Sequence, residues 1–115
     1  MLLCSYFDEQ RPRDIVSISL GVPPGMQVAG AWPNVMPTPA LLRRWKSGAI
    51  TWDQYREEYL DTLRARWPRG LNDEMAALRD DCTLCCWEPE PQHCHRSILA
   101  DVIQTCRPDL TVQLQ

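Results

Sequence analysis

The residues best suited to chemistry lie in one segment, residues 83–103, with the sequence TLCCWEPEPQHCHRSILADVI. Two adjacent cysteines are followed by a glutamate and then by the triplet Cys94-His95-Arg96. Thiol, imidazole, carboxylate and guanidinium groups cost free energy when they are buried without partners, so packing alone does not explain such a cluster. A functional site is therefore expected here.

The triplet predicts a thiol or anion site at the start of a helix. A helix dipole stabilises a thiolate at its N-terminus, which makes Cys94 the best nucleophile candidate. Glu88 or His95 would serve as acid or base, and Arg96 would clamp a carboxylate or phosphate with its planar fork of donors. His95 also falls on the apolar stripe of the expected helix, so a structural, hydrogen-bonded histidine fits the pattern equally well. Further ligand contacts are expected from Cys86, Ser97 and Pro24.

The same cysteines allow a metal site as an alternative. Cys82 and Cys85 have the C-x-x-C spacing of zinc ligands, but side chains alternate along a strand, so these two would face opposite sides. A set that could still converge at the strand end consists of Cys86, His93, Cys94 and His95. No cofactor is predicted, and zinc or iron bound by that set is the alternative. Burial as small hydrophobic residues is expected for Cys82, Cys85 and Cys106.

Hydrophobic patterning predicts the elements that would position this cluster. Apolar runs predict strands over residues 2–7, 15–20 and 82–87, and alternating apolar residues predict a last strand over residues 110–114. Helices are expected over residues 39–47, 51–67, 72–79 and 95–106, closed by Arg107-Pro108. The aromatic stripe of the second helix is expected to be core. Residues 21–37 are rich in proline and glycine, which predicts a long loop without regular structure.

The third strand, the last helix and the final strand form a β-α-β unit. Such units are nearly always right-handed and have parallel strands. The chain is therefore predicted to be a small three-layer Rossmann-like α/β domain, with a mainly parallel sheet of about four strands flanked by helices. Ligands of open parallel sheets bind beyond the carboxyl ends of the strands, where residues 87–95 would lie.

Length and composition limit the remaining possibilities. A chain of 115 residues is expected to form one domain, residues 1–115. Its formal net charge of −3 argues against nucleic acid as a partner, and no stretch approaches the roughly twenty apolar residues of a membrane span. Three of the six cysteines fall within five residues, which fits reduced thiols and a cytoplasmic protein better than a disulfide framework. The oligomeric state stays open.

Two segments resemble the domain-of-unknown-function 488 (DUF488) family. In residues 83–103 the matching positions of its L-C-x-E, linker, C-H-R and helix signature are Cys85, Cys86, Glu88, Cys94, His95 and Arg96. Upstream, VSISLGVPPGM follows the first strand, and PTPALLRRWKSGAITWDQYREEYLDTLR is similar to the family's P-x-x-L-L-x-x-(W/Y)-K-x-G-x-I-x-W-x-x-Y segment. The resemblance covers most of the chain. It implies a compact α/β fold with Rossmann-like layers and implies no established reaction.

Three functions are compatible with these observations. The first is binding, with or without turnover, of a small anionic molecule such as a nucleotide or phosphosugar at Glu88, Cys94, His95 and Arg96. The second is a metal-binding or thiol-redox module built from the same cysteines. The third is a non-catalytic protein-interaction domain, for which an exposed Trp32 or Trp45 would be the sign.

Overall fold

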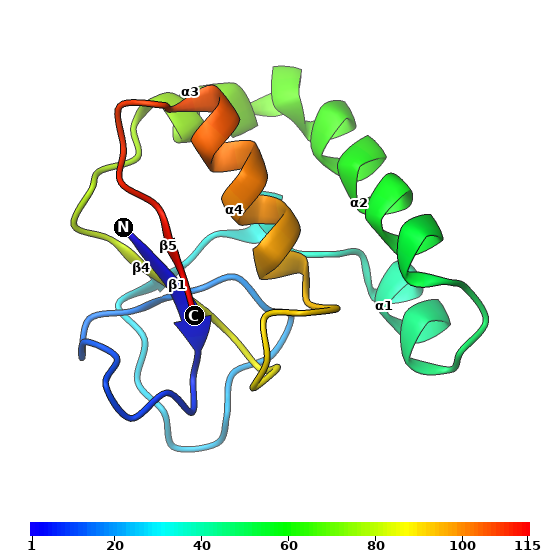
Figure 1. Cartoon of the computed structure of the whole chain (residues 1–115), viewed down its shortest axis with the longest axis horizontal. Coiled ribbons are helices and arrows are strands. Elements are labelled where there is room, and N and C mark those ends of the chain that lie inside the picture. The colour runs from blue at the N-terminus through cyan, green and yellow to red at the C-terminus, as the bar shows by residue number, and fades with distance from the viewer.

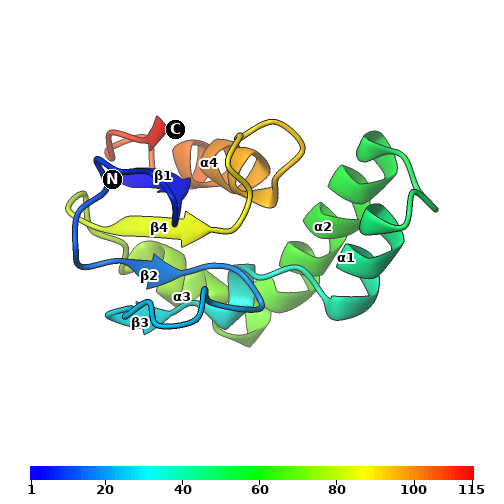
Figure 2. The same ribbon diagram turned by 90° about the horizontal axis from the view of Figure 1, so that it is seen from below.

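A parallel sheet of five strands forms the centre of the computed structural model, which describes residues 1–115 (Figure 1). Its strands are β1 (Leu2–Ser5), β2 (Val16–Ser17), β3 (Gly30–Ala31), β4 (Thr83–Cys86) and β5 (Gln113–Leu114). They lie in the order β3-β2-β4-β1-β5, which Figure 2 shows across the sheet, and every pair is parallel. The carboxyl ends of all strands therefore meet at one edge.

Four helices begin and end close to the predicted residues: α1 (Pro39–Lys46), α2 (Trp52–Arg66), α3 (Leu71–Ala76) and α4 (His95–Cys106). The Thr38 hydroxyl caps α1, and a capping box between Thr51 and Gln54 starts α2. Short 3₁₀ helices precede α1 (Pro33–Val35) and follow α2 (Trp67–Arg69). Gly70 adopts a left-handed φ of 113° between the second of these and α3, a conformation that favours glycine.

The two faces of the sheet bury separate cores because side chains alternate along each strand. Leu3 and Leu84 belong to a large core beneath the helices, whereas Cys4 and Cys85 belong to a small one on the other face. Loop residues such as Met26 cover the small core. The α/β class with a parallel sheet and flanking helices is thus confirmed, with five strands where about four were expected.

One expectation about the N-terminal half needs correction. Residues 21–37 are not wholly irregular, because Gly30–Ala31 forms the edge strand β3 beside β2. The prolines flank this dipeptide rather than interrupt it, and an edge strand needs ladder hydrogen bonds on one side only. Strands β1 and β2 follow each other in sequence, yet β4 lies between them in the sheet.

The aromatic stripe of α2 is core, as expected, through Tyr55, Tyr59 and Leu63, while Trp67 beyond its end is exposed. Trp32 is buried and Trp45 is half-buried, so the sign proposed for an interaction domain is not met. None of the helices combines the length and apolar character that crossing a membrane requires.

Candidate thiol site

The end of β4 and the start of α4 bring two buried thiols together. Cys86 is the last residue of β4, Cys94 is the N-cap of α4, and their Sγ atoms are 3.0 Å apart. The intervening residues 87–93 fold back as a loop in which His93 has a positive φ of 56°. Such a conformation is uncommon outside glycine, and it turns the chain immediately before Cys94. We call Cys86, Cys94 and the adjoining His95 the thiol site.

The His95 side chain is oriented by the backbone immediately after β2. Its Nε2 lies 2.7 Å from the carbonyl oxygen of Ile18, which can only accept, so Nε2 carries the proton. Nδ1 is then an acceptor, and it lies 3.9 Å from the Cys94 Sγ. The ring packs edge-on against Tyr59, with centroids 5.6 Å apart. His95 is thus buried and hydrogen-bonded, as expected of a structural histidine, and its free ring nitrogen faces the thiol.

The environment favours a thiolate on Cys94. The hydrogen bond with Cys86, together with the nearby imidazole of His95, holds the pKa of Cys94 well below its usual range despite burial. The same hydrogen bond and burial raise the pKa of Cys86. Cys86 therefore stays protonated and donates a hydrogen bond to the Cys94 sulfur, as expected for two close thiols that cannot both ionise. Of the two sulfurs, Cys94 is therefore the one whose surroundings favour the thiolate.

The Arg96 side chain is buried next to the thiols and does not line the pocket above them. It is fully buried, and it donates to the Cys86 Sγ at 3.0 Å and to the carbonyl oxygens of Glu88, Pro89 and Gln115 at 2.6–3.1 Å. These bonds engage every nitrogen of the guanidinium. The geometry makes Arg96 a positioning residue for the thiols and the loop, which differs from the external anion clamp expected from the sequence.

A small pocket opens above the thiols, beyond the carboxyl ends of the neighbouring strands β2 and β4. Its volume is about 40 Å³, and we call it the site pocket. It is lined by residues from the strand ends, α1, α2 and the loop before α4: Ser19, Pro37, Leu42, Trp45, Lys46, Tyr55, Cys86, Trp87, Glu88, His93, Cys94 and His95. Glu88, expected as an acid or base, lines this pocket, and its carboxylate pairs with Lys46 of α1.

Sequence reasoning missed the contribution of α1 and α2 to this pocket. Tyr55 had a detectable signal, because aromatic residues recur at helical spacing along α2, but that spacing is typical of core. Trp45 had no such signal, because it is the only aromatic residue of α1. Lys46 had none, since a lysine in the last turn of a helix is ordinary.

Other predicted site residues lie near the site or away from it. The Ser97 hydroxyl donates to the Cys94 carbonyl at 2.8 Å, and so it tightens the first turn of α4. His93 packs against Trp45 and Trp52, with distances between ring centroids of 5.6 and 5.1 Å. Pro24 is exposed and is absent from the lining of the site pocket. The thiol site therefore does not include it.

The alternative metal set does not converge. No three histidine, cysteine, aspartate or glutamate side chains in the chain are grouped so that they could hold a metal ion. His95 directs Nε2 to Ile18 and only its Nδ1 faces Cys94, while His93 packs against Trp45 and Trp52. Zinc or iron ligation therefore has no geometric support among these residues.

The other four cysteines lie outside the site. Cys4 and Cys85 are paired in register across β1 and β4 and meet at 3.4 Å within the small core. Cys82 is half-buried, as expected for a packed thiol, whereas Cys106 is exposed and departs from that expectation. Cys85 and Cys86 face opposite sides of the sheet, as strand alternation predicts.

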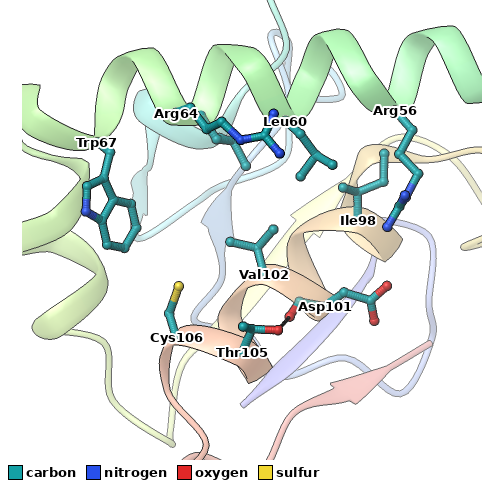
Figure 3. Close-up of a pocket in the computed structure, with 10 residues that line it drawn as sticks. Arg56, Leu60, Arg64, Trp67, Ile98, Asp101, Val102, Thr105 and Cys106 are labelled. Carbon is teal, nitrogen blue, oxygen red and sulfur yellow. Dashed lines mark hydrogen bonds between the residues drawn. The ribbon is translucent and has the colours of Figure 1, made fainter.

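A larger groove of about 490 Å³ lies elsewhere, between α2 and α4. Figure 3 shows Leu60, Ile98 and Val102 forming its floor, with Arg56 and Asp101 at its rim. The Thr105 hydroxyl there donates to the Asp101 carbonyl rather than into the groove. Because no buried polar side chain points into this groove, the smaller pocket above the thiols is the better candidate site.

Fold and site together define a small parallel α/β protein with a buried cysteine pair where the central strand meets the last helix. The chain belongs to the DUF488 family: the model of the active DUF488-N3 subclade, DUF488-N3a, matches residues 3–107. That match includes both segments of the resemblance and every residue of the thiol site. No curated protein and no solved structure matches significantly.

Proposed function

We propose that the protein is a cysteine-dependent enzyme in which Cys94 is the nucleophile toward a small molecule bound in the site pocket. One observation carries the proposal: the Cys94 Sγ lies at a helix N-terminus, 3.0 Å from the Cys86 Sγ and 3.9 Å from an acceptor nitrogen of His95. Nucleophilic catalysis needs a nucleophile, a base and a group that orients the base, and Cys94, His95 and the Ile18 carbonyl have the positions for these three roles.

The roles follow from the hydrogen bonds. Nδ1 of His95 takes the Cys94 proton, and the Ile18 carbonyl holds the ring in that tautomer. The sulfur then attacks an electrophilic atom of the substrate, forming a covalent bond while the leaving group departs with the proton from His95. Cys86 stabilises the resting thiolate by its hydrogen bond.

A small anionic substrate, such as a nucleotide or phosphosugar, would take the place of the Glu88 carboxylate as the partner of Lys46 in the pocket. Lys46 is the only lysine or arginine among the lining residues, and the N-terminus of α4 adds partial positive charge beside it. Arg96 contributes by holding the loop that forms the pocket wall. Six free cysteines support placing the protein in a reducing compartment such as the cytoplasm.

Alkylation with iodoacetamide at pH 6 tests the proposal, with peptide mass spectrometry assigning the modified residue. Cys94 should react faster than the exposed Cys106, because a thiolate is the reacting form and the pKa of Cys94 is lowered. A Cys94→Ser variant provides the matched control. Modification of Cys106 and Cys82 with Cys94 untouched would exclude Cys94 as a nucleophile.

The closeness of the two sulfurs also favours a second candidate, thiol-disulfide exchange. With a small disulfide as oxidant, the Cys94 thiolate would attack one sulfur and release one thiolate. Cys86 would then lose its proton and attack the Cys94 sulfur, forming the Cys86–Cys94 disulfide and releasing the second thiol. With hydroxyethyl disulfide, wild type should form the internal disulfide, and Cys86→Ser should stop at the mixed disulfide on Cys94. A stable mixed disulfide in wild type would contradict the exchange.

A further inference from the structure

Three exposed hydrophobic side chains gather at the sheet edge that carries the thiol site. Phe7 comes shortly after β1, Leu20 after β2 and Trp87 directly after β4, and these strands are neighbours with their carboxyl ends together. Only five large hydrophobic side chains are exposed in the chain, so three of them at one edge is an unequal distribution. Exposed apolar surface beside a pocket marks a surface that binds something.

Trp87 is held rigidly although it is 39% exposed. Its Nε1 donates to the Gly21 carbonyl at 2.6 Å. The buried Tyr6 ring meets the indole edge-on, with centroids 6.2 Å apart and planes at 84°, and the Phe7 ring lies 5.9 Å away at 56°. An aromatic face that is already fixed and has its N–H satisfied binds a flat partner with little further loss of conformational freedom.

Trp87 also lines the site pocket together with Cys94. The pocket has a volume of only about 40 Å³, which admits a reactive group of a few atoms but not a ring. A substrate whose reactive group enters this pocket must therefore place the rest of its structure outside, against the rim that Trp87 forms.

We infer that the substrate carries a planar aromatic or heteroaromatic ring that stacks on Trp87 while its reactive atom reaches Cys94. This inference rests on the proposed role of Cys94 as nucleophile and adds the class of molecule that it attacks. Phe7 extends the aromatic surface beside Trp87. Leu20 adds apolar surface next to Gly21.

The test compares N-phenylmaleimide with N-ethylmaleimide, which present the same reactive carbon with and without an aromatic ring. Rates of Cys94 modification are measured in the full chain with Cys106→Ser, and each is divided by the rate with N-acetylcysteine. The corrected ratio of phenyl to ethyl should be about threefold to tenfold, the range that an aromatic stacking contact supplies. Trp87→Leu should return it to about one.

The chain offers a matched control in Trp67, which is also 39% exposed but lies at the α2–α4 groove. Trp67→Leu should leave the ratio unchanged. Phe7→Leu should lower it partly and gives a second variant in case Trp87→Leu does not fold, which circular dichroism would reveal. A wild-type ratio near one, with Cys94 still reacting quickly, would overturn the aromatic substrate and leave the nucleophile intact. Failure of Cys94 to react with either probe would overturn both proposals.

Discussion

At the scale of single residues, the proposed chemistry depends on how one proton is shared between two sulfurs. The Cys86 thiol donates to the Cys94 sulfur, the Arg96 guanidinium donates to Cys86, and the Ile18 carbonyl fixes the His95 tautomer. Each of these partners is itself buried or part of the backbone, so the arrangement has few alternatives. Its consequence is a pair of thiols whose pKa values move in opposite directions.

The lowered pKa of Cys94 predicts an unusual pH profile. Thiolate reactivity is full above the pKa of the thiol and falls as pH drops through it, so the alkylation rate of Cys94 should stay level from pH 8 to pH 6. An ordinary cysteine, with a pKa of about 8.5, slows roughly tenfold for each pH unit over that range. Iodoacetamide kinetics read by mass spectrometry would show the difference.

Cys86→Ala should shift the Cys94 profile toward higher pH, because it removes the hydrogen bond from Cys86 that is the main cause of the lowered pKa. Cys85→Ala changes a neighbouring thiol on the opposite face of the sheet and should leave the profile in place. A profile for Cys94 like that of free cysteine in the unmodified chain would contradict the assignment of the thiolate.

Arg96→Lys should destabilise the fold while preserving the charge. Lysine cannot reproduce donors that reach the Cys86 sulfur and three carbonyl oxygens at once, so several buried acceptors lose their partners. The expected loss is about 2–4 kcal/mol in the free energy of unfolding, measured in urea. Arg64→Lys, on the exposed face of α2, serves as control and should change stability little. A stability equal to wild type would show that Arg96 does not hold the loop.

At the scale of elements, α2 matters because it carries the aromatic wall of the site. Trp52 and Tyr55 stack with centroids 4.9 Å apart and planes at 13°, and Tyr55 reaches the site pocket. Both lie in the first turn after the capping box of Thr51 and Gln54, so the cap determines where this wall begins.

Thr51→Ala should therefore cost about 1 kcal/mol in the free energy of unfolding, the usual loss for an N-cap. The backbone N–H of Gln54 loses its acceptor, the Thr51 hydroxyl, while the rest of the helix is unchanged. Thr51→Ser keeps the hydroxyl and should retain most of the stability. Urea unfolding followed by tryptophan fluorescence measures both, and equal stability of the alanine and wild-type proteins would count against a working cap.

The elements themselves were largely predictable from the sequence, and their assembly was not. The helices follow from capping residues and apolar periodicity, and the strand with two cysteines follows from its apolar run. The edge strand at Gly30 escaped because two residues carry no periodic signal. The strand order escaped because it depends on pairings between segments far apart in the chain, such as β1 with β4.

The candidate site was predictable in its residue types and only partly in its geometry. Cys94 at a helix start and Cys86 at a strand end follow from local pattern, and the structure has both there. The role of Arg96 could not be inferred, because its partners are backbone carbonyls whose positions depend on how a loop folds. Lys46 was missed for a related reason, since its pairing with Glu88 joins residues far apart in the chain.

At the scale of the whole molecule, stability is divided between two cores of unequal size on the faces of one sheet. Leu84 and Cys85 are adjacent on β4 and bury into different cores. The larger core joins the sheet to the helices that form the site, whereas the smaller one joins it to loops. Substitutions in the larger core should therefore affect both the stability of the fold and the shape of the site pocket.

Leu84→Ala should reduce the free energy of unfolding by about 3 kcal/mol, because it removes a fully buried side chain from a packed core. Cys85→Ala removes one sulfur from the smaller core and should cost about 1 kcal/mol. Urea unfolding would measure both losses, and a single transition is expected for one domain. A larger loss for Cys85→Ala would mean that the loop-covered face dominates stability.

The adjacency of Cys85 and Cys86 on β4 makes the identity of the reactive partner a matter of strand alignment. One peptide unit separates a sulfur that meets Cys94 from one that meets Cys4 behind the sheet. A slip of β4 by one residue against β1 that put Cys86 opposite Cys4 would put Trp87 at the position from which Cys86 now meets Cys94. The protein would then lose the proposed chemistry without losing any of the residues assigned to it.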